Sequence, residues 1–281
     1  MNRFATAALL TICAFSSLVW AEDRASLEMD NPFFAFDNGV ATGRLAPPEQ
    51  AAMLKELGYD GIGYNTADHL PERLAAFDEA GLKVFSIYVN VMLKPDGYDI
   101  QFDVPRTVAL LKGRDTRIWL TIRGHGGEKA EESALAAIRE IADAAAPAGV
   151  QVVLYPHVKF YVETTDQGTR LAKLSQRPNV GTSLNLCHWL QKEPEKPLRE
   201  ILDRAGDRLM LVSINGAEQG GRGWDQLIQP LGSGSYDVYA VLKELKSRGY
   251  TGPIGLQCFR VPGPPREHLG KSITAWREMV D

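Results

Sequence analysis

The sequence predicts an α/β protein built as a single (β/α)8 barrel of the TIM type. Eight short apolar runs, rich in β-branched residues, recur along the 281-residue chain, and amphipathic stretches lie between them. Strict alternation of strand and helix implies a parallel sheet, and eight such units favour a closed barrel. An open doubly wound sheet is the alternative, but it usually carries a Gly-rich first turn, and Asp37-Asn38-Gly39 lacks that pattern.

Strands and helices are predicted in order along the chain. The predicted strands are Phe33–Phe36, Gly61–Tyr64, Val84–Val89, Ile118–Ile122, Val150–Leu154, Val180–Leu184, Leu209–Ile214 and Ile254–Leu256. The predicted helices are Pro48–Leu57, Pro71–Ala80, Glu131–Ala146, Asp166–Ser175, Leu198–Ala205, Tyr236–Arg248 and Arg266–Val280. Several helices are followed by a glycine that suits a left-handed C-cap, as at Gly58, Gly81 and Gly249, and these glycines mark the return to the next strand.

The first residues predict export. A positive charge at Arg3 precedes an almost uncharged apolar run over residues 7–20, and Ala21 ends a loose small-x-small cleavage site. The run is shorter than the roughly 18 residues that a membrane span needs. We therefore expect a signal peptide at 1–21, a single barrel domain at 22–281, and a periplasmic or secreted protein that is not bound to a membrane.

Composition excludes two classes of partner. The chain carries 31 basic and 35 acidic residues, a formal net charge of −4, which argues against nucleic acid and against anionic membrane surfaces. Only Cys187 and Cys258 lie beyond the predicted signal peptide, which is too few for a disulfide framework. They follow strands that are not neighbours, so we expect two packed thiols rather than a disulfide.

Four segments in the second half of the chain carry specific motifs. They are Val153–His157, Pro178–His188, Pro230–Asp237 and Gly249–Gln257. Val153–His157 resembles a strand that ends in Glu-Asn-His, and Pro178–His188 resembles a pattern of Asp followed three residues later by His. Pro230–Asp237 resembles a PLGxGxxD turn, and Gly249–Gln257 resembles a last strand that ends in Glu. These are motifs of the xylose-isomerase-like barrels, which include sugar isomerases and epimerases. The resemblance implies a xylose-isomerase-like TIM barrel that acts on a small carbohydrate.

The resemblance also implies a divalent metal on the barrel axis, held by Glu, Asp, His and Glu. The matching positions here are Tyr155, Asn185, Asn215 and Gln257, with Ser213 in place of Asn215 if the alignment slips by two residues. The anionic ligands are thus replaced by neutral amides or a phenol, whereas a hard divalent cation prefers anionic oxygens. We therefore expect no metal and no other cofactor.

Histidines are the expected acid–base groups. A Gln amide accepts no proton near neutral pH, so Gln257 cannot be a base, whereas the unperturbed pKa of histidine is about 6.5. We expect His157 and His188 to be catalytic, with Tyr155 donating to a developing enolate oxygen unless it only packs in the core. A zinc ion held by these two histidines and His125 is the alternative use of the imidazoles.

Polar residues beyond the strand ends predict a sugar-binding site, because the active site of a barrel lies at the C-terminal ends of its strands. Amides both donate to and accept from hydroxyl groups, although they could also satisfy one another. Arg123 is expected to pair with a carboxylate, either Glu163 or an acidic group of the substrate. The expected substrate-binding residues are Arg123, His125, Asn185, Asn215, Glu218 and Gln257.

These observations predict an exported sugar isomerase or epimerase-like enzyme that transfers a proton next to a carbonyl without the metal of the family. The alternative is a non-catalytic carbohydrate-binding barrel. Amides and the loop aromatics Trp189, Trp224 and Phe259 would bind a sugar in either case. The distinguishing feature is whether His157 and His188 point into one cavity.

Overall fold

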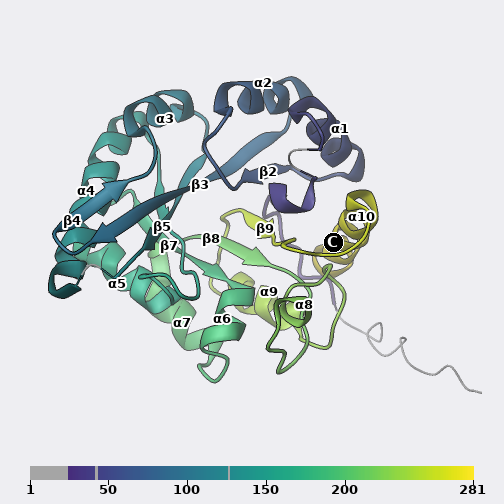
Figure 1. Cartoon of the computed structure of the whole chain (residues 1–281). Helices are drawn as coiled ribbons and strands as arrows, with labels where there is room; N and C mark the ends of the chain where they lie inside the picture. Colours follow the sequence, from purple (N-terminus) through teal and green to yellow (C-terminus); the bar gives the residue numbers. More distant parts are fainter. Residues whose placement is uncertain (1–24, 42–43, 126) are drawn as a thin grey trace, which may run out of the picture.

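The computed structural model describes residues 25–41, 44–125 and 127–281. Eight parallel strands close into a barrel, since the first strand pairs with both the second and the last, and the second pairs with the third (Figure 1). The strands are β1 (Phe33–Phe36), β2 (Gly61–Tyr64), β3 (Lys83–Lys94), β5 (Arg117–Arg123), β6 (Val152–Leu154), β7 (Val180–Asn185), β8 (Leu209–Ile214) and β9 (Ile254–Leu256). The predicted barrel and all eight predicted barrel strands are confirmed.

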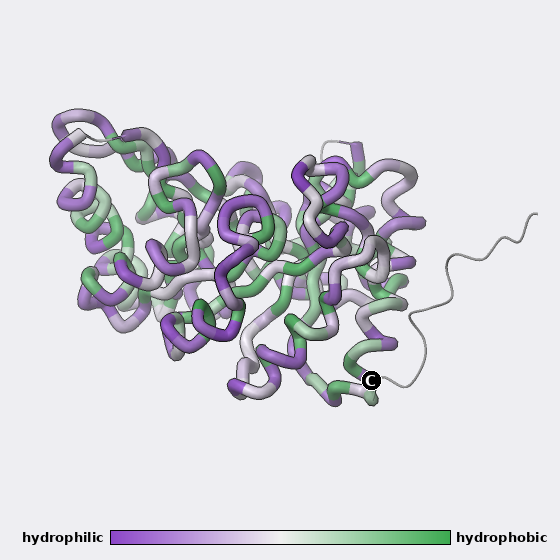
Figure 2. The backbone as a smooth tube through the Cα atoms, turned by 90° about the horizontal axis from the view of Figure 1, so that it is seen from below, coloured by the Kyte–Doolittle hydropathy of each residue, from purple (hydrophilic) through white to green (hydrophobic). Residues whose placement is uncertain are grey.

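Helices surround these strands in Figure 1. They are α1 (Pro47–Leu57), α2 (Leu70–Ala80), α3 (Val104–Leu111), α4 (Ala130–Ala145), α5 (Thr165–Ser175), α6 (Leu186–Lys192), α7 (Leu198–Ala205), α8 (Trp224–Leu227), α9 (Val238–Ser247) and α10 (Pro265–Val280), with short 3-10 turns at Asp37–Gly39, Gly127–Lys129, Ala146–Ala148 and Gly206–Arg208. Hydrophobic and hydrophilic residues alternate along them (Figure 2), as expected of helices with one face on the core. Within the described ranges, none is long and apolar enough to span a bilayer.

The barrel interior holds its own hydrophobic cluster, separate from the layer between strands and helices. It is rich in aromatic residues, and the ring of Trp119 stacks on that of Tyr155 with centroids 4.0 Å apart and planes at 9°. Glycines on the two strands that flank β1 make room for Phe34, because a Cβ atom at Gly63 or Gly255 would lie 2.7 Å from its ring. This packed aromatic interior forms the floor of the site described below.

A hairpin and three helices depart from the predicted elements. Strand β3 continues to Lys94, well beyond the predicted end at Val89, and turns back through β4 (Gly97–Ile100), which pairs with it antiparallel. Alternating buried residues such as Val91 and Leu93 sustain the longer strand. Helix α3, which follows the hairpin, and helices α6 and α8 were not predicted either. The expectation that Trp189 and Trp224 lie in loops is wrong, since they lie in α6 and α8. The extension matters for the site because its Met92 pairs with the last residue of β5.

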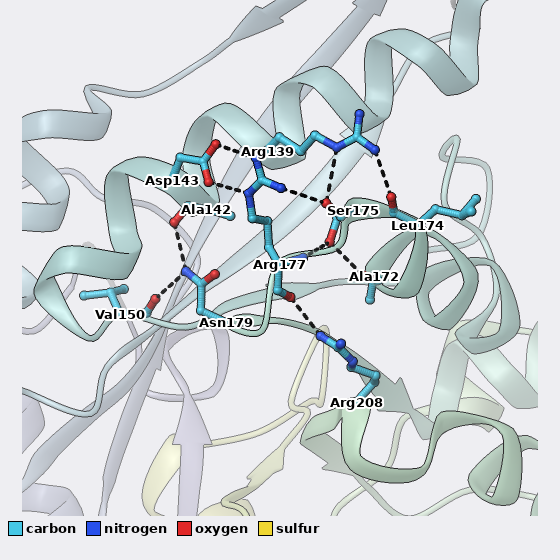
Figure 3. Close-up of polar contacts among 10 residues, drawn as sticks. All are labelled: Arg139, Ala142, Asp143, Val150, Ala172, Leu174, Ser175, Arg177, Asn179 and Arg208. Carbon is cyan, nitrogen blue, oxygen red and sulfur yellow. Dashed lines mark hydrogen bonds and ion pairs between the residues drawn. The ribbon is translucent and has the colours of Figure 1, made fainter.

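A network of polar contacts holds the loop that leads into β7 (Figure 3). Asn179 donates through Nδ2 to the carbonyl oxygens of Ala142 and Val150, at 2.9 and 3.2 Å. Arg177 forms an ion pair with Asp143 of α4. These contacts tie the N-terminal end of β7 to α4 and to the segment that leads into β6, so they set the position of both strands. The opposite ends of these two strands carry the candidate site.

Candidate functional site

Tyr155 lies at the centre of a polar cluster directly after β6. Its phenol oxygen is 3.2 Å from Nε2 of His188, and the side chain of Gln257 lies near it. Three segments that are far apart in the sequence, those following β6, β7 and β9, therefore meet around one side chain. Burial raises the pKa of Tyr155 well above its ordinary value of 10, so the side chain is a neutral phenol.

His188 is held between this phenol and the backbone. It lies in the first turn of α6, which begins immediately after β7 without an intervening loop. The backbone N–H of Val158 points at Nδ1, at 3.5 Å, so Nδ1 accepts and the proton is assigned to Nε2. Trp224 of α8 contacts the imidazole edge-on at 5.3 Å. Burial lowers the pKa of His188 well below 6.5 and keeps the ring neutral.

His157 presents the opposite nitrogen. Its Nδ1 lies 2.8 Å from the carbonyl oxygen of Val158, so Nδ1 carries the proton and Nε2 keeps a lone pair. The ring lies 4.1 Å from that of His188 and stacks on Phe160 at 3.9 Å. Burial and, less strongly, the charge of Arg123 lower the pKa of His157 below 6.5, although the bond to Val158 opposes them. His157 and His188 thus lie side by side, both neutral.

Arg123 ends β5 at the edge of this cluster. Its Nη2 donates to the phenol oxygen of Tyr88 at 2.9 Å, and its guanidinium lies 4.3 Å above the ring of Phe160. The predicted pairing with Glu163 is wrong. Glu163, in the loop before α5, instead forms an ion pair at 2.6 Å with Lys192, the last residue of α6.

Gln257, at the end of β9, is largely engaged with the protein. Its Oε1 accepts from Nδ2 of Asn38 at 2.8 Å and from the backbone N–H groups of Cys258 and Phe259 at 3.0 Å. Because Oε1 already accepts these bonds, its amide nitrogen is the group left to face Tyr155.

Asn185 and Asn215 are turned into the protein rather than toward the cluster. Asn185 is 1% exposed, donates to the carbonyl oxygen of Pro156 at 2.9 Å, and accepts from Ser213 at 3.1 Å. Asn215 donates to the carbonyl oxygen of Leu227 at 2.6 Å and is fully buried. Ser213, and not Asn215, is therefore the side chain beside Asn185, and the alignment with Ser213 at the third metal position is the one that the geometry supports.

Two predicted site residues lie apart from the cluster. His125 is exposed and follows Gly124, and Glu218 accepts from Ser235 at 2.6 Å and from Gln229. Glu218 thereby orders the loop after β8 and lines an outer cavity with Trp189. Within the described part of the chain, neither residue makes a hydrogen bond to the cluster around Tyr155.

The inherited metal positions do not fit a hard divalent cation. They hold Tyr155, Asn185, Ser213 and Gln257, a set without a carboxylate, and the amides of Asn185 and Gln257 are already engaged. Over residues 25–41, 44–125 and 127–281, no three His, Cys, Asp or Glu side chains are arranged to hold a metal ion. Zinc binding by His125, His157 and His188 is also disfavoured, because His125 is exposed and apart from the cluster and both ring nitrogens of His188 are engaged, Nδ1 with Val158 and Nε2 with Tyr155.

Sequence reasoning missed two aromatic residues of the site, Tyr88 and Phe160, which contact Arg123 and, in the case of Phe160, also His157. Tyr88 could have been found, because it precedes Asn90 by two residues and so shares its face of β3. Phe160 lies in an irregular loop and carried no signal. A cavity of about 300 Å³ opens beside Tyr88 and Asn90, and Asn65 lines it from the next strand end.

The chain belongs to the xylose isomerase-like TIM barrel family, whose model matches residues 101–279. This match covers the second half of the barrel, including β6 and β7 with their catalytic candidates. The family assignment confirms the resemblance drawn from the motifs after the fifth to eighth barrel strands.

Several solved structures share the fold. A 3-keto-D-glucoside 4-epimerase from E. coli is 18% identical over 88% of this chain and 98% of its own, with a TM-score of 0.68. A D-allulose 3-epimerase from Methylomonas sp., solved in complex with D-allulose, is 16% identical over 90% and 99%, with a TM-score of 0.69. The IOLI protein with a bound zinc atom is 18% identical over 89% and 98%, with a TM-score of 0.70. No curated protein sequence matches the chain.

Proposed function

We propose that this protein is a sugar isomerase or epimerase that moves a proton next to a carbonyl without a divalent metal. The observation that carries the proposal is the contact of 3.2 Å between Tyr155 Oη and His188 Nε2, with the ring of His157 beside it. Tyr155, at one of the positions matched to a metal ligand of the family, thus lies beside two imidazoles that can donate or accept a proton. The sugar epimerases among the structural neighbours support the choice of a carbohydrate substrate.

Tyr155 serves as the acid in this proposal. His188 Nε2–H donates to the phenol oxygen and the nearby amide of Gln257 is a second donor for it, so the hydrogen of Tyr155 is free to point at a substrate carbonyl. A neutral phenol supported by two donors stabilises the oxygen of an enolate in the way an oxyanion hole does. His188 is thus a positioning residue, and Tyr155 makes the catalytic contact.

His157 serves as the base. Its Nε2 lone pair takes the proton from the carbon next to the carbonyl, and the electrons of that C–H bond form the enolate that Tyr155 stabilises. In an isomerisation the imidazolium returns the proton to the neighbouring carbon, while the proton of the adjacent hydroxyl moves to the oxygen bound by Tyr155. In an epimerisation the enolate turns its opposite face to His157 before the proton returns to the same carbon. The lowered pKa of His157 ensures that the neutral, accepting form dominates near pH 7.

Deuterium exchange tests this proposal directly. The purified protein is incubated in D2O with a panel of unphosphorylated sugars and oxidised glycosides, and exchange of carbon-bound hydrogen is followed by NMR. We expect exchange with at least one sugar, and its loss in Tyr155→Phe. Sugar binding without any exchange would favour the second candidate, a carbohydrate-binding barrel.

We also propose that the protein is exported. The predicted signal peptide at 1–21 lies outside the described residues, so the support for export is the charged and apolar pattern of the sequence. Expression of the full chain, fractionation of the cells and N-terminal sequencing test the proposal. A mature protein that begins after Ala21 outside the cytoplasm is the expected result, and an intact N-terminus in the cytoplasm would contradict it.

A further inference from the structure

Arg123 is a half-buried cation without an ionic partner. Among the described residues it makes one hydrogen bond, from Nη2 to Tyr88, and its Nε is closed off from solvent with no acceptor. No carboxylate of the described chain lies within ion-pair distance of its guanidinium. The lone negative candidate from the sequence, Glu163, is neutralised by Lys192.

The surroundings of Arg123 stabilise a cation only in part. The ring of Phe160 lies 4.3 Å from the guanidinium and that of Tyr88 lies 5.9 Å away, so both offer cation–π attraction. Removing a guanidinium from water nevertheless costs more than two rings and one neutral hydroxyl return, and a partly desolvated charge normally has a counter-ion. Among the described residues, Arg123 therefore has room for an anionic partner that the protein itself does not supply.

The position of Arg123 is fixed by the backbone. Arg123, the last residue of β5, pairs with Met92 of the extended β3, and the next residue, Gly124, has a φ of +85°. A Cβ atom at Gly124 would lie 2.5 Å from the carbonyl oxygen of Leu93, so only glycine fits this close approach. The hairpin extension therefore fixes the backbone of Arg123, and the bond to Tyr88 and the ring of Phe160 hold its guanidinium beside the cluster around Tyr155.

We propose that the substrate is an acidic sugar whose carboxylate is bound by Arg123 and Tyr88. This inference rests on the proposed function and names its substrate class. A guanidinium matches a carboxylate with parallel hydrogen bonds, and the hydroxyl of Tyr88, which accepts from Arg123, has its own hydrogen left to donate.

The geometry places the two ends of such a substrate on different groups. The rings of Tyr88 and Tyr155 are in edge-to-face contact, with centroids 5.3 Å apart, so the group that would bind the carboxylate lies next to the group that would bind the carbonyl. The carboxylate end lies at Arg123 and Tyr88, and the carbonyl end lies at Tyr155 and His157. Since both histidines are neutral, Arg123 is the charge in the cluster that distinguishes a sugar acid from the corresponding neutral sugar.

Matched pairs of sugars test the inference by calorimetry on the whole protein. D-Glucuronate is compared with D-glucose, and D-galacturonate with D-galactose, because each pair differs in the carboxylate. We expect at least one uronate to bind at least tenfold more tightly than its hexose, with Arg123→Gln abolishing the preference and Arg123→Lys retaining part of it. Arg260→Gln is the control, since Arg260 also lies over an aromatic ring, at 5.1 Å, but is exposed.

The outcomes separate this inference from the proposed function. Equal binding of acid and neutral sugar by the wild type, or a preference that survives Arg123→Gln in a protein folded by circular dichroism, overturns the acidic substrate. Arg123-dependent binding of a uronate without deuterium exchange supports the substrate class and removes the isomerase. Deuterium exchange on a neutral sugar, at a rate unchanged in Arg123→Gln, supports the isomerase or epimerase and removes the acidic substrate.

Discussion

The nitrogen atoms of His157 and His188 differ in what they offer a substrate. Nε2 of His157 is the free lone pair, whereas Nε2 of His188 faces a phenol. We expect His157→Gln to lower kcat by about 100-fold or more, the usual loss of an acid–base group. His188→Leu should lower kcat less than His157→Gln does. His188→Gln should retain more activity than His188→Leu, because the Gln amide can donate to Tyr155. An unchanged kcat in His157→Gln would remove this residue as the base.

The pH profile of activity reports the same residue. Burial lowers the pKa of His157, so the accepting form persists below 6.5 and is lost only as the solution becomes more acidic. Tyr155, with a pKa raised well above 10, stays protonated through neutral pH. We expect kcat/KM to be flat from about pH 6.5 to 8, the range bounded by the ordinary histidine pKa, and to fall on the acidic side. An acidic limb centred above pH 7 would contradict this assignment.

The free energy of unfolding should depend on pH through buried histidine rings, including that of His157. The pKa values of His157, His188 and His268 are all lowered by burial, so the unfolded chain binds more protons than the folded one in mildly acidic solution. Their contribution to stability is complete above the unfolded pKa of about 6.5 and declines as the pH falls below it. Denaturant unfolding at pH 7.5 and at pH 5 measures the difference. His188→Gln should reduce that difference, and an identical difference in the variant would contradict the linkage.

Among the elements, the loop before β7 depends on one amide. Asn179 satisfies two backbone carbonyls through Nδ2, so Asn179→Ala should lower the free energy of unfolding by about 1–3 kcal/mol. Activity per folded molecule should not change, because the loop lies at the end of the barrel away from Tyr155. Asp143→Asn is the control, since it removes the largely exposed ion pair with Arg177 and should cost at most about 1 kcal/mol. Equal losses in both variants would contradict this account.

The sequence predicted the barrel strands because strand and helix periods differ and glycines mark the helix ends. It did not predict the hairpin, since the apolar alternation of β3 continues past the barrel rim without a break until the turn before Gly97. The rule that sites follow strand ends identified Tyr155, His157 and His188. The rule could not predict that the side chain of Asn215 turns away from the cluster and donates to the carbonyl oxygen of Leu227, because the rule specifies the end of the strand and not the side-chain rotamer.

At the scale of the whole molecule, the barrel should retain the geometry of a metal site whose ligands have been replaced. We expect the purified protein to hold no stoichiometric divalent metal after dialysis, because the inherited positions are neutral. One equivalent of Mn, Co or Zn in elemental analysis would contradict this.

Restoring the ligands tests the same idea. The variant with Tyr155→Glu, Asn185→Asp, Ser213→His and Gln257→Glu should bind a divalent ion. Placing the histidine by Asn215→His instead should not, because Asn215 is directed at Leu227. Calorimetric titration with Mn, Co and Zn compares the two variants, with folding checked by circular dichroism. Equal affinities, or no binding by the first variant, would show that the ligand positions are assigned wrongly.

The stacking of Trp119 on Tyr155 gives the barrel an internal optical reporter. The indole is 1% exposed, lies flat against the phenol at 4.0 Å, and donates to Ser183 at 3.0 Å. A molecule that hydrogen-bonds to the phenol alters the electronic environment of the indole without touching it. Ligand binding at the centre should therefore be visible in near-ultraviolet circular dichroism and fluorescence of the unlabelled protein, before any reaction of the ligand is known.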